Sequence, residues 1–262
     1  MRRYARLFAV QLRASALLAM QYRVDFVIDG MLSAFSAGVA LIPLFVVFTH
    51  RTSIEGWTFG EALVVTGWFT LLQGVLEGAI NPSLTTVVDH IRKGTLDFVL
   101  LKPADAQFMV STARFLPWRA MSIVTALGIF VVAFVRLGRL PSLTGVLLSL
   151  AMLVAAIALL YALWILTVSA AFYVVKIDNL TFLFGSIFDF ARWPSSLFRG
   201  VVGFVFTFIL PLALMTTYPA EALLGRLRLS TFLGSLVAAV CFVTFARLVW
   251  KSSIRRYTSA SS

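Results

Sequence analysis

The sequence predicts an all-α integral membrane protein with six transmembrane helices, preceded by an amphipathic helix at the membrane surface. Of the 262 residues, 60% are hydrophobic and only 13% are charged, whereas soluble domains carry about a quarter charged residues. The apolar runs are continuous and about twice as long as the strands of a membrane barrel, which suits helices crossing roughly 30 Å of hydrocarbon. The composition excludes a soluble fold. Because only helices and closed barrels satisfy their backbone in lipid, and the run lengths exclude a barrel, helices remain.

The first 23 residues precede any long apolar run and predict a helix that lies along the membrane. A helical wheel puts three arginines on one side and three apolar or aromatic residues on the other: Arg2, Arg6 and Arg13 against Tyr4, Phe8 and Leu12. The arginines suit anionic head groups, so we expect this segment to be an interfacial anchor that contacts membrane lipids.

Six apolar runs follow, and we interpret them as spans of a single domain that covers residues 1–262. They lie at about 30–49, 57–80, 119–135, 143–170, 200–218 and 231–246. The second span is expected to end at Asn81-Pro82, because proline disfavours helix in the residue before it. The fifth is expected to be kinked or ended near Pro211.

Two charged stretches separate these runs on one side of the membrane. Residues 83–118 form a long loop with a steady supply of charge, which we assign to the cytoplasm. Residues 176–199 mix charge with many phenylalanines and predict an interfacial loop with a short amphipathic helix. A seventh half-span stays open as an alternative, because 179–188 carry no charge but are too few to cross alone.

The basic residues fix the expected orientation. In this topology 17 of the 22 Lys and Arg residues lie on the side of the two termini and 5 on the other. Lys and Arg near span ends stay in the cytoplasm, so both termini are expected there. The excess of 22 basic over 11 acidic residues is therefore a feature of membrane topology and does not indicate nucleic-acid binding.

The sequence carries no motif for catalysis, metal binding or nucleotide binding. The phosphate-binding pattern G-x-x-x-x-G-K-[ST] and the H-E-x-x-H pattern are both missing. His50 and His90 fall on opposite sides of the membrane in the expected topology, so they cannot share a metal ion. For Glu77, close to the end of the second span, an interfacial position and a place in a transport pathway both stay open. We therefore expect no enzyme activity and no cofactor in this chain.

One stretch resembles a known family. Residues 89–108 read DHIRKGTLDFVLLKPADAQF. This is similar to permeases of type-2 ATP-binding-cassette (ABC) exporters, in a bacterial branch with I-R-x-G-x-L-D-x-x-L-L-K-P in the same loop. The basic N-terminus, the six spans and a late element from Pro211 to Glu221 extend the resemblance over most of the chain.

The resemblance implies a transmembrane subunit of the bacterial cytoplasmic (inner) membrane, coupled to two separate ABC ATPase subunits that bind ATP and Mg. A second permease half, the same or a homologous chain, would complete the pathway. The ATPase-coupling residues would be Arg92, Lys93, Gly94, Asp97, Lys102 and Pro103. From the residues alone, anchoring of this loop at lipid head groups explains them equally well. An ATP-independent channel or secondary carrier, or an assembly subunit that moves nothing, stays open as an alternative function.

Overall fold

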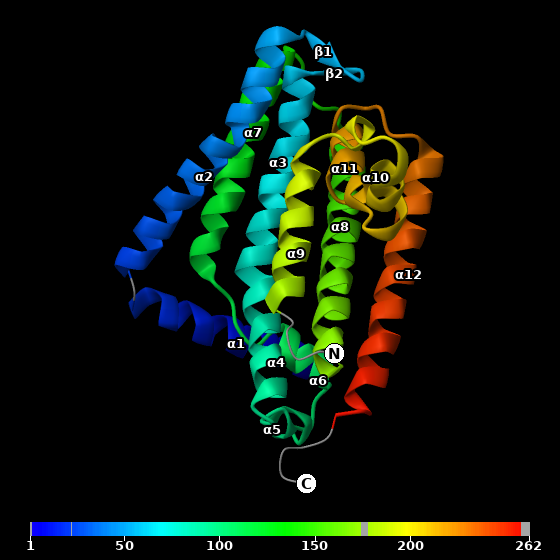
Figure 1. Ribbon diagram of the computed structural model, residues 1–262. Helices are drawn as coiled ribbons and strands as arrows, with labels where there is room; N and C mark the ends of the chain where they lie inside the picture. Colours follow the sequence, from blue (N-terminus) through cyan, green and yellow to red (C-terminus); the bar gives the residue numbers. More distant parts are fainter. Residues whose placement is uncertain (1, 22, 174–177, 258–262) are drawn as a thin grey trace.

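The protein is a bundle of long helices. The computed structural model describes residues 2–21, 23–173 and 178–257 (Figure 1). The long helices are α1 (Arg2–Gln21), α2 (Arg23–His50), α3 (Phe59–Val75), α4 (Asn81–Arg92), α7 (Ala120–Leu137), α8 (Leu143–Ser169) and α12 (Leu229–Ile254). Shorter elements are β1 (Ser53–Ile54), β2 (Trp57–Thr58), α5 (Asp97–Leu100), α6 (Ala106–Ser111), α9 (Asp178–Phe188), α10 (Gly200–Phe204) and α11 (Tyr218–Leu223).

The predicted membrane fold is confirmed. In the described part of the chain, five helices are long and apolar enough to cross a membrane, and a bent pair of helices at 200–223 raises the number to at most six. The observed helices over Gly30–His50, Pro117–Leu137, Leu143–Phe172 and Leu229–Ile254 lie close to the predicted first, third, fourth and sixth spans.

The bundle has two distinct ends (Figure 1). The hairpin end carries β1 and β2, which pair in antiparallel register with Ile54 opposite Trp57. Glu55 and Gly56 between them both have positive φ, 49° and 80°, as a two-residue I′ turn requires. The loop end carries residues 93–116 with α5 and α6. Helix α1 lies crosswise there, and α12 ends there.

The sequence predicted that the second span ends at Asn81-Pro82. The helix instead continues past both residues. A single helical run covers Phe59–Arg92, with a π-helical turn at Leu76–Ile80 between α3 and α4. Pro82 has no N–H to donate to the carbonyl of Gly78, but that carbonyl accepts a hydrogen bond from the N–H of Leu116, 2.8 Å away. The helix therefore passes through proline because a π-turn and a neighbouring segment satisfy the backbone.

A seam of glycines joins α3 to α7. A Cβ added to Gly60, Gly67 or Gly74, which lie seven residues apart, would come within 3.0 Å of a side-chain atom on α7. Seven residues make two helical turns, so the three glycines share one face. Missing side chains on that face let the two helices approach closely, as small residues do in membrane bundles.

Of the predicted interfacial loop at 176–199, the structure describes residues 178–199, and Lys176 lies outside them. The described residues do not stay at the loop end, because α9 runs along α3 toward the hairpin end (Figure 1), as the alternative of a half-span expects. Phe188 lies against Phe69 of α3, with ring centroids 5.3 Å apart. Farther along, Trp57 Nε1 donates to Ser196 Oγ at 3.1 Å. The uncharged run is too short to cross lipid alone, and its continuation packs on protein.

The predicted fifth span at 200–218 is bent near Pro211, as expected, but it does not cross the bundle. Gly200–Ile209 and Ala213–Leu223 meet at an angle of 67°, at the break around Pro211. Arg199, before the pair, forms an ion pair with Glu55, and Arg226, after it, forms one with Glu61. Both ends of the segment therefore lie at the hairpin end, and the segment is a re-entrant hairpin.

This path changes the distribution of charge. Arg199 lies at the hairpin end, and Arg192 stacks its guanidinium over Phe69 within the bundle, 5.1 Å from the ring centroid. Of the 21 basic residues that the structure describes, 14 therefore lie at the loop end. The basic excess at the loop end persists.

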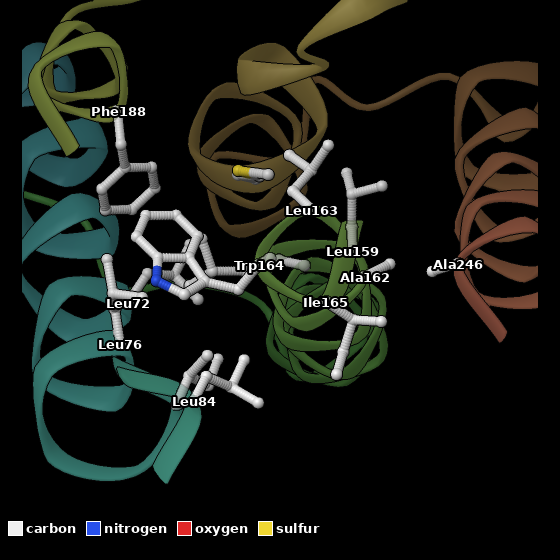
Figure 2. Close-up of a cluster of buried hydrophobic side chains, with 14 of the residues drawn as sticks. Leu72, Leu76, Leu84, Leu159, Ala162, Leu163, Trp164, Ile165, Phe188 and Ala246 are labelled. Atoms are coloured by element: carbon white, nitrogen blue, oxygen red, sulfur yellow. The ribbon is translucent and has the colours of Figure 1, made fainter. Parts of the chain in front are cut away.

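The main core lies between α3, α4, α8 and α9 (Figure 2). Trp164 of α8 points toward α3 beside Leu72 and Phe188, and its side chain is almost fully buried. Its Nε1 donates to Asn81 Oδ1 at 3.4 Å. Because Asn81 follows the π-turn directly, this core holds the irregular helix in register.

Candidate functional site

The loop end begins where Gly94 stops α4. The N–H of Gly94 donates to Ile91 O at 3.3 Å, and the N–H of Thr95 donates to His90 O at 2.9 Å. This is the Schellman pattern, and it needs the positive φ of Gly94, 65°, which costs glycine no strain. Gly94 therefore terminates the helix sharply, and the next residues turn away from the bundle axis.

Helix α5 presents two opposite surfaces. Leu96 and Val99 face inward and are 0% and 9% exposed, whereas Phe98 and Leu101 are 70% and 81% exposed. Three-residue spacing brings Leu96 and Val99 to the same inner side. The inner pair fastens the loop to the core, and the outer pair leaves a large apolar surface at the tip of the molecule.

The predicted coupling residues lie around this tip. Arg92 and Lys93 at the end of α4 are exposed, and so are Lys102 and Pro103 after α5, whereas Gly94 and Asp97 are half-buried. The structure therefore brings the six residues to one end of the protein, around Phe98 and Leu101.

Asp105 fastens the next part of the loop to the bundle. Its Oδ1 accepts from the N–H of Phe108 at 3.0 Å and so caps α6. Its two oxygens accept from Arg247 of α12. These hydrogen bonds from Arg247, aided by that of Phe108, hold the pKa of Asp105 below its ordinary value although partial burial opposes them. Asp105 is therefore a charged cross-link between loop and helix.

Gln107 extends this link to α8. Its Oε1 accepts from Arg247 Nη1 at 2.6 Å, and its Nε2 donates to the hydroxyl of Tyr161 at 2.9 Å. The hydroxyl of Ser111 lies 2.7 Å from the same Tyr161 oxygen. We call Asp105, Gln107, Ser111, Tyr161 and Arg247 the loop clamp. It joins the loop to α8 and α12 together.

Helix α1 packs on the same loop. Phe8 and Phe115 meet edge to face, with ring centroids 5.5 Å apart, and Tyr4 meets Phe108 similarly at 4.9 Å. Ser15 is buried and its Oγ accepts from the N–H of Phe115 at 3.1 Å. The predicted anchor residues Arg2, Arg6 and Arg13 are exposed. One face of α1 therefore contacts protein, and Arg2, Arg6 and Arg13 lie outside this contact.

Comparison with known proteins decides the family. The sequence profile described as "ABC-2 family transporter protein" matches residues 34–261. This chain belongs to the ABC-2 family. No curated protein and no solved structure matches it significantly. The resemblance found in the sequence is thereby confirmed, and the protein is a multi-pass membrane permease of a transporter.

Two carboxylates in the helical run Phe59–Arg92 of the ABC-2 permease, Glu61 and Glu77, have arginine partners. Glu77, in the π-turn, accepts from Gln73 Nε2 at 3.1 Å and lies 2.6 Å from Arg119 Nη1. Glu61, at the hairpin end, pairs with Arg226 and lies 3.7 Å from Arg139 Nη2. Its Oε2 also accepts from the N–H of Thr58, 3.0 Å away. A place for Glu77 in the transport pathway stays a prediction.

The loop clamp of the ABC-2 permease was not predicted. Asp105 lies in the charged loop 83–118, and Arg247 follows the predicted sixth span at 231–246. One signal was available, because Asp105 stands directly before a short apolar run, as an N-cap residue does. Its partner lies 142 residues away, so no local pattern could pair them.

Among the described residues, no group of three or more His, Cys, Asp or Glu could hold a metal ion.

Proposed function

We propose that this ABC-2 permease is the transmembrane subunit of an ATP-driven exporter in the bacterial cytoplasmic membrane. Separate ATPase subunits bind its loop end, and the loop end lies in the cytoplasm together with both termini. The observation that carries the proposal is the exposure of Phe98 and Leu101, 70% and 81%, beyond the end of α4. Large exposed apolar side chains with a polar rim are typical of a protein-docking surface.

The charge distribution supports this orientation. The loop end holds 14 of the 21 basic residues that the structure describes, and basic residues near span ends remain in the cytoplasm. Around the apolar tip, Arg92, Lys93 and Lys102 offer positive charge to an acidic rim on the partner. Such charges steer association and set register more than they add affinity.

The loop clamp supports the coupling step. A movement of the docked loop reaches α12 through Asp105 and Arg247, and reaches α8 through Gln107 and Tyr161. Helix α1 moves with the same loop through Tyr4 and Phe8. In this account ATP and Mg are bound by two ATPase subunits, and closure of that pair changes the exposure of the pathway. The pathway is completed by a second permease half, the same or a homologous chain.

Co-purification with the ATPase subunit tests the proposal. Replacing Phe98 and Leu101 together by serine removes the apolar tip without touching the buried Leu96 and Val99. We expect this variant to lose the ATPase subunit, identified by its own nucleotide-binding sequence. Leu140→Ser is the matched control, because Leu140 is 87% exposed but follows α7 at the hairpin end. Retention of the ATPase by the Phe98/Leu101 variant contradicts the proposal.

The alternative is an ATP-independent channel or secondary carrier. Ionisable side chains within the membrane commonly mark the proton or ion pathway of such carriers. Glu61 and Glu77 both form ion pairs with arginine, so an arginine already occupies the position of a bound cation at each carboxylate. Flux through the purified permease in liposomes, driven by an ion gradient without ATP, would establish the alternative.

A further inference from the structure

A cavity of about 330 Å³ lies at the hairpin end. Its walls come from three parts of the chain: α2, the β-hairpin with the start of α3, and residues 190–198. Six aromatic or large aliphatic side chains form most of it: Phe48, Trp57, Phe190, Trp193, Leu197 and Phe198. It lies far along the bundle from the loop clamp and the apolar tip, so the docking surface does not account for it.

The lining selects an apolar ligand. All ten residues around the cavity have apolar or aromatic side chains. The indole N–H of Trp57 already donates to Ser196 Oγ, 3.1 Å away, so it is engaged within the protein. Ligand pockets usually measure about 300–1,000 Å³, which puts this cavity at the small end. It suits one extended hydrocarbon chain better than a bulky ring system.

The rim of the cavity is charged. Glu55 follows the lining residue Ile54, and Arg199 follows the lining residue Phe198. The two side chains form an ion pair that joins the hairpin wall to the opposite wall. Arg199 keeps 76% of its side chain exposed in this pair, and Arg51 is exposed at the end of α2. Two arginines against one glutamate favour an anionic head group beside an apolar cavity.

We propose that this cavity binds the hydrocarbon chain of an anionic amphiphile, with its head group at Arg199 and Arg51. Apolar contact with Trp193, Leu197 and Phe198 holds the chain, and the arginines hold the charge. The Glu55–Arg199 pair competes with the head group for Arg199, so Glu55 weakens binding. The site needs only the membrane-embedded fold, and it does not depend on the ATPase.

Photolabelling of the full-length permease in nanodiscs tests the site. The probe is a diazirine-bearing dodecanoic acid, and the corresponding dodecanol is its uncharged counterpart. We expect both to label the cavity-lining residues when adducts are mapped by mass spectrometry. Leu197→Trp fills the cavity and is expected to reduce this labelling about tenfold. Leu233→Trp, on the exposed face of α12, is the matched control and leaves it unchanged.

Two rim variants test the head-group contact without changing the cavity. Arg199→Gln is expected to lower labelling by dodecanoic acid about threefold, and Glu55→Gln to raise it by a similar factor, as partly exposed charges allow. Labelling by dodecanol should respond to neither. Adding phosphatidylglycerol to phosphatidylcholine nanodiscs lowers labelling if resident anionic lipid is the natural occupant. No change indicates another anionic amphiphile, and both outcomes are consistent with the site.

Three results would overturn the proposal. Adducts spread evenly over the lipid-facing helices would show that the probe merely dissolves in the membrane. Equal labelling of the Leu197→Trp and Leu233→Trp variants would show that the cavity is not the site. A cavity filled by a second permease half would give adducts only when the halves are separated. None of these results depends on an ATPase, so they leave the proposed function untouched.

Discussion

Arg247 of α12 donates hydrogen bonds to both carboxylate oxygens of Asp105, the residue that caps α6. The two residues lie 142 positions apart in the chain, yet they form a direct polar link between the loop end and a membrane-spanning helix. Whatever moves the loop therefore pulls on α12.

Arg247→Gln should uncouple the permease without releasing its partner. The substitution removes the charge of the loop clamp but leaves Phe98 and Leu101 in place. We expect the ATPase subunit still to co-purify, while the permease-dependent change in its ATP hydrolysis rate falls by about 2- to 30-fold, the range given by 0.5–2 kcal/mol of lost coupling. Arg136→Gln, at the end of α7, is the control. Loss of the ATPase from the complex, or unchanged hydrolysis, contradicts this role.

Asp105 predicts a defined dependence of stability on pH. Its pKa in the folded protein is lower than the ordinary value of 3.8, so its ionised form is favoured by folding. The stabilisation is present above the ordinary pKa and is lost as the pH falls through the lowered one. The difference in melting temperature between the wild type and Asp105→Asn should stay constant from pH 8 to pH 5. It should shrink only in strongly acidic solution, below pH 3.8.

The size of this difference is small because the pair is partly exposed. Side-chain exposures of 33% for Arg247 and 35% for Asp105 allow water to screen the charges, which limits the contribution to about 1 kcal/mol or less. A difference that disappears between pH 8 and pH 6 would point to another titrating group and would contradict the assignment.

Gly145→Ala should push α8 away from α11. A Cβ at Gly145 would lie 2.9 Å from the carbonyl oxygen of Ala222, and a backbone atom cannot turn aside as a side chain can. We expect a loss of about 1–3 kcal/mol in the free energy of unfolding, measured by thermal unfolding in detergent. Gly128→Ala is the matched control, because a Cβ there meets nothing within 4 Å. Equal stability of the two variants would refute the close approach.

Glu55 and Glu61, both at the hairpin end, should differ in their effect on stability. Glu61→Ala removes a buried carboxylate that pairs with Arg226 and accepts from the N–H of Thr58 at the N-terminus of α3. We therefore expect the free energy of unfolding to fall by about 1–3 kcal/mol. Glu55→Ala breaks the exposed pair with Arg199 and should cost about 0–1 kcal/mol. Thermal unfolding of both variants checks the order, and a larger loss for Glu55→Ala contradicts it.

Much of the fold could be predicted from hydrophobic length and charge. The first, third, fourth and sixth spans follow from apolar runs that end at charged residues or at turns. The predicted helix end at Pro82 was wrong because the proline rule is local: the carbonyl that Pro82 leaves free at Gly78 accepts from the N–H of Leu116, far along the chain. The path of residues 179–188 could not be predicted because it depends on packing against α3, which is a tertiary property.

The candidate site was predicted in part. The motif at 89–108 located the loop, and Gly94 ends its helix as its residue type indicates. The contact of α1 with the loop could not be deduced from the helical wheel. The wheel distinguishes an apolar face from a basic one but not protein from lipid as the partner of Phe8. Which residues of α5 turn outward was equally out of reach, since Phe98 and Leu96 are both apolar.

Site-specific cross-linking from the tip of the loop tests the central claim most directly. A photoreactive amino acid replaces Phe98 in the full-length permease, in membranes of cells that produce the whole complex, and a second sample carries it at Leu140. The account predicts that position 98 cross-links to an ATPase subunit and that position 140 does not. A position 98 that is labelled from outside the cell, or that cross-links only to lipid, would contradict the account.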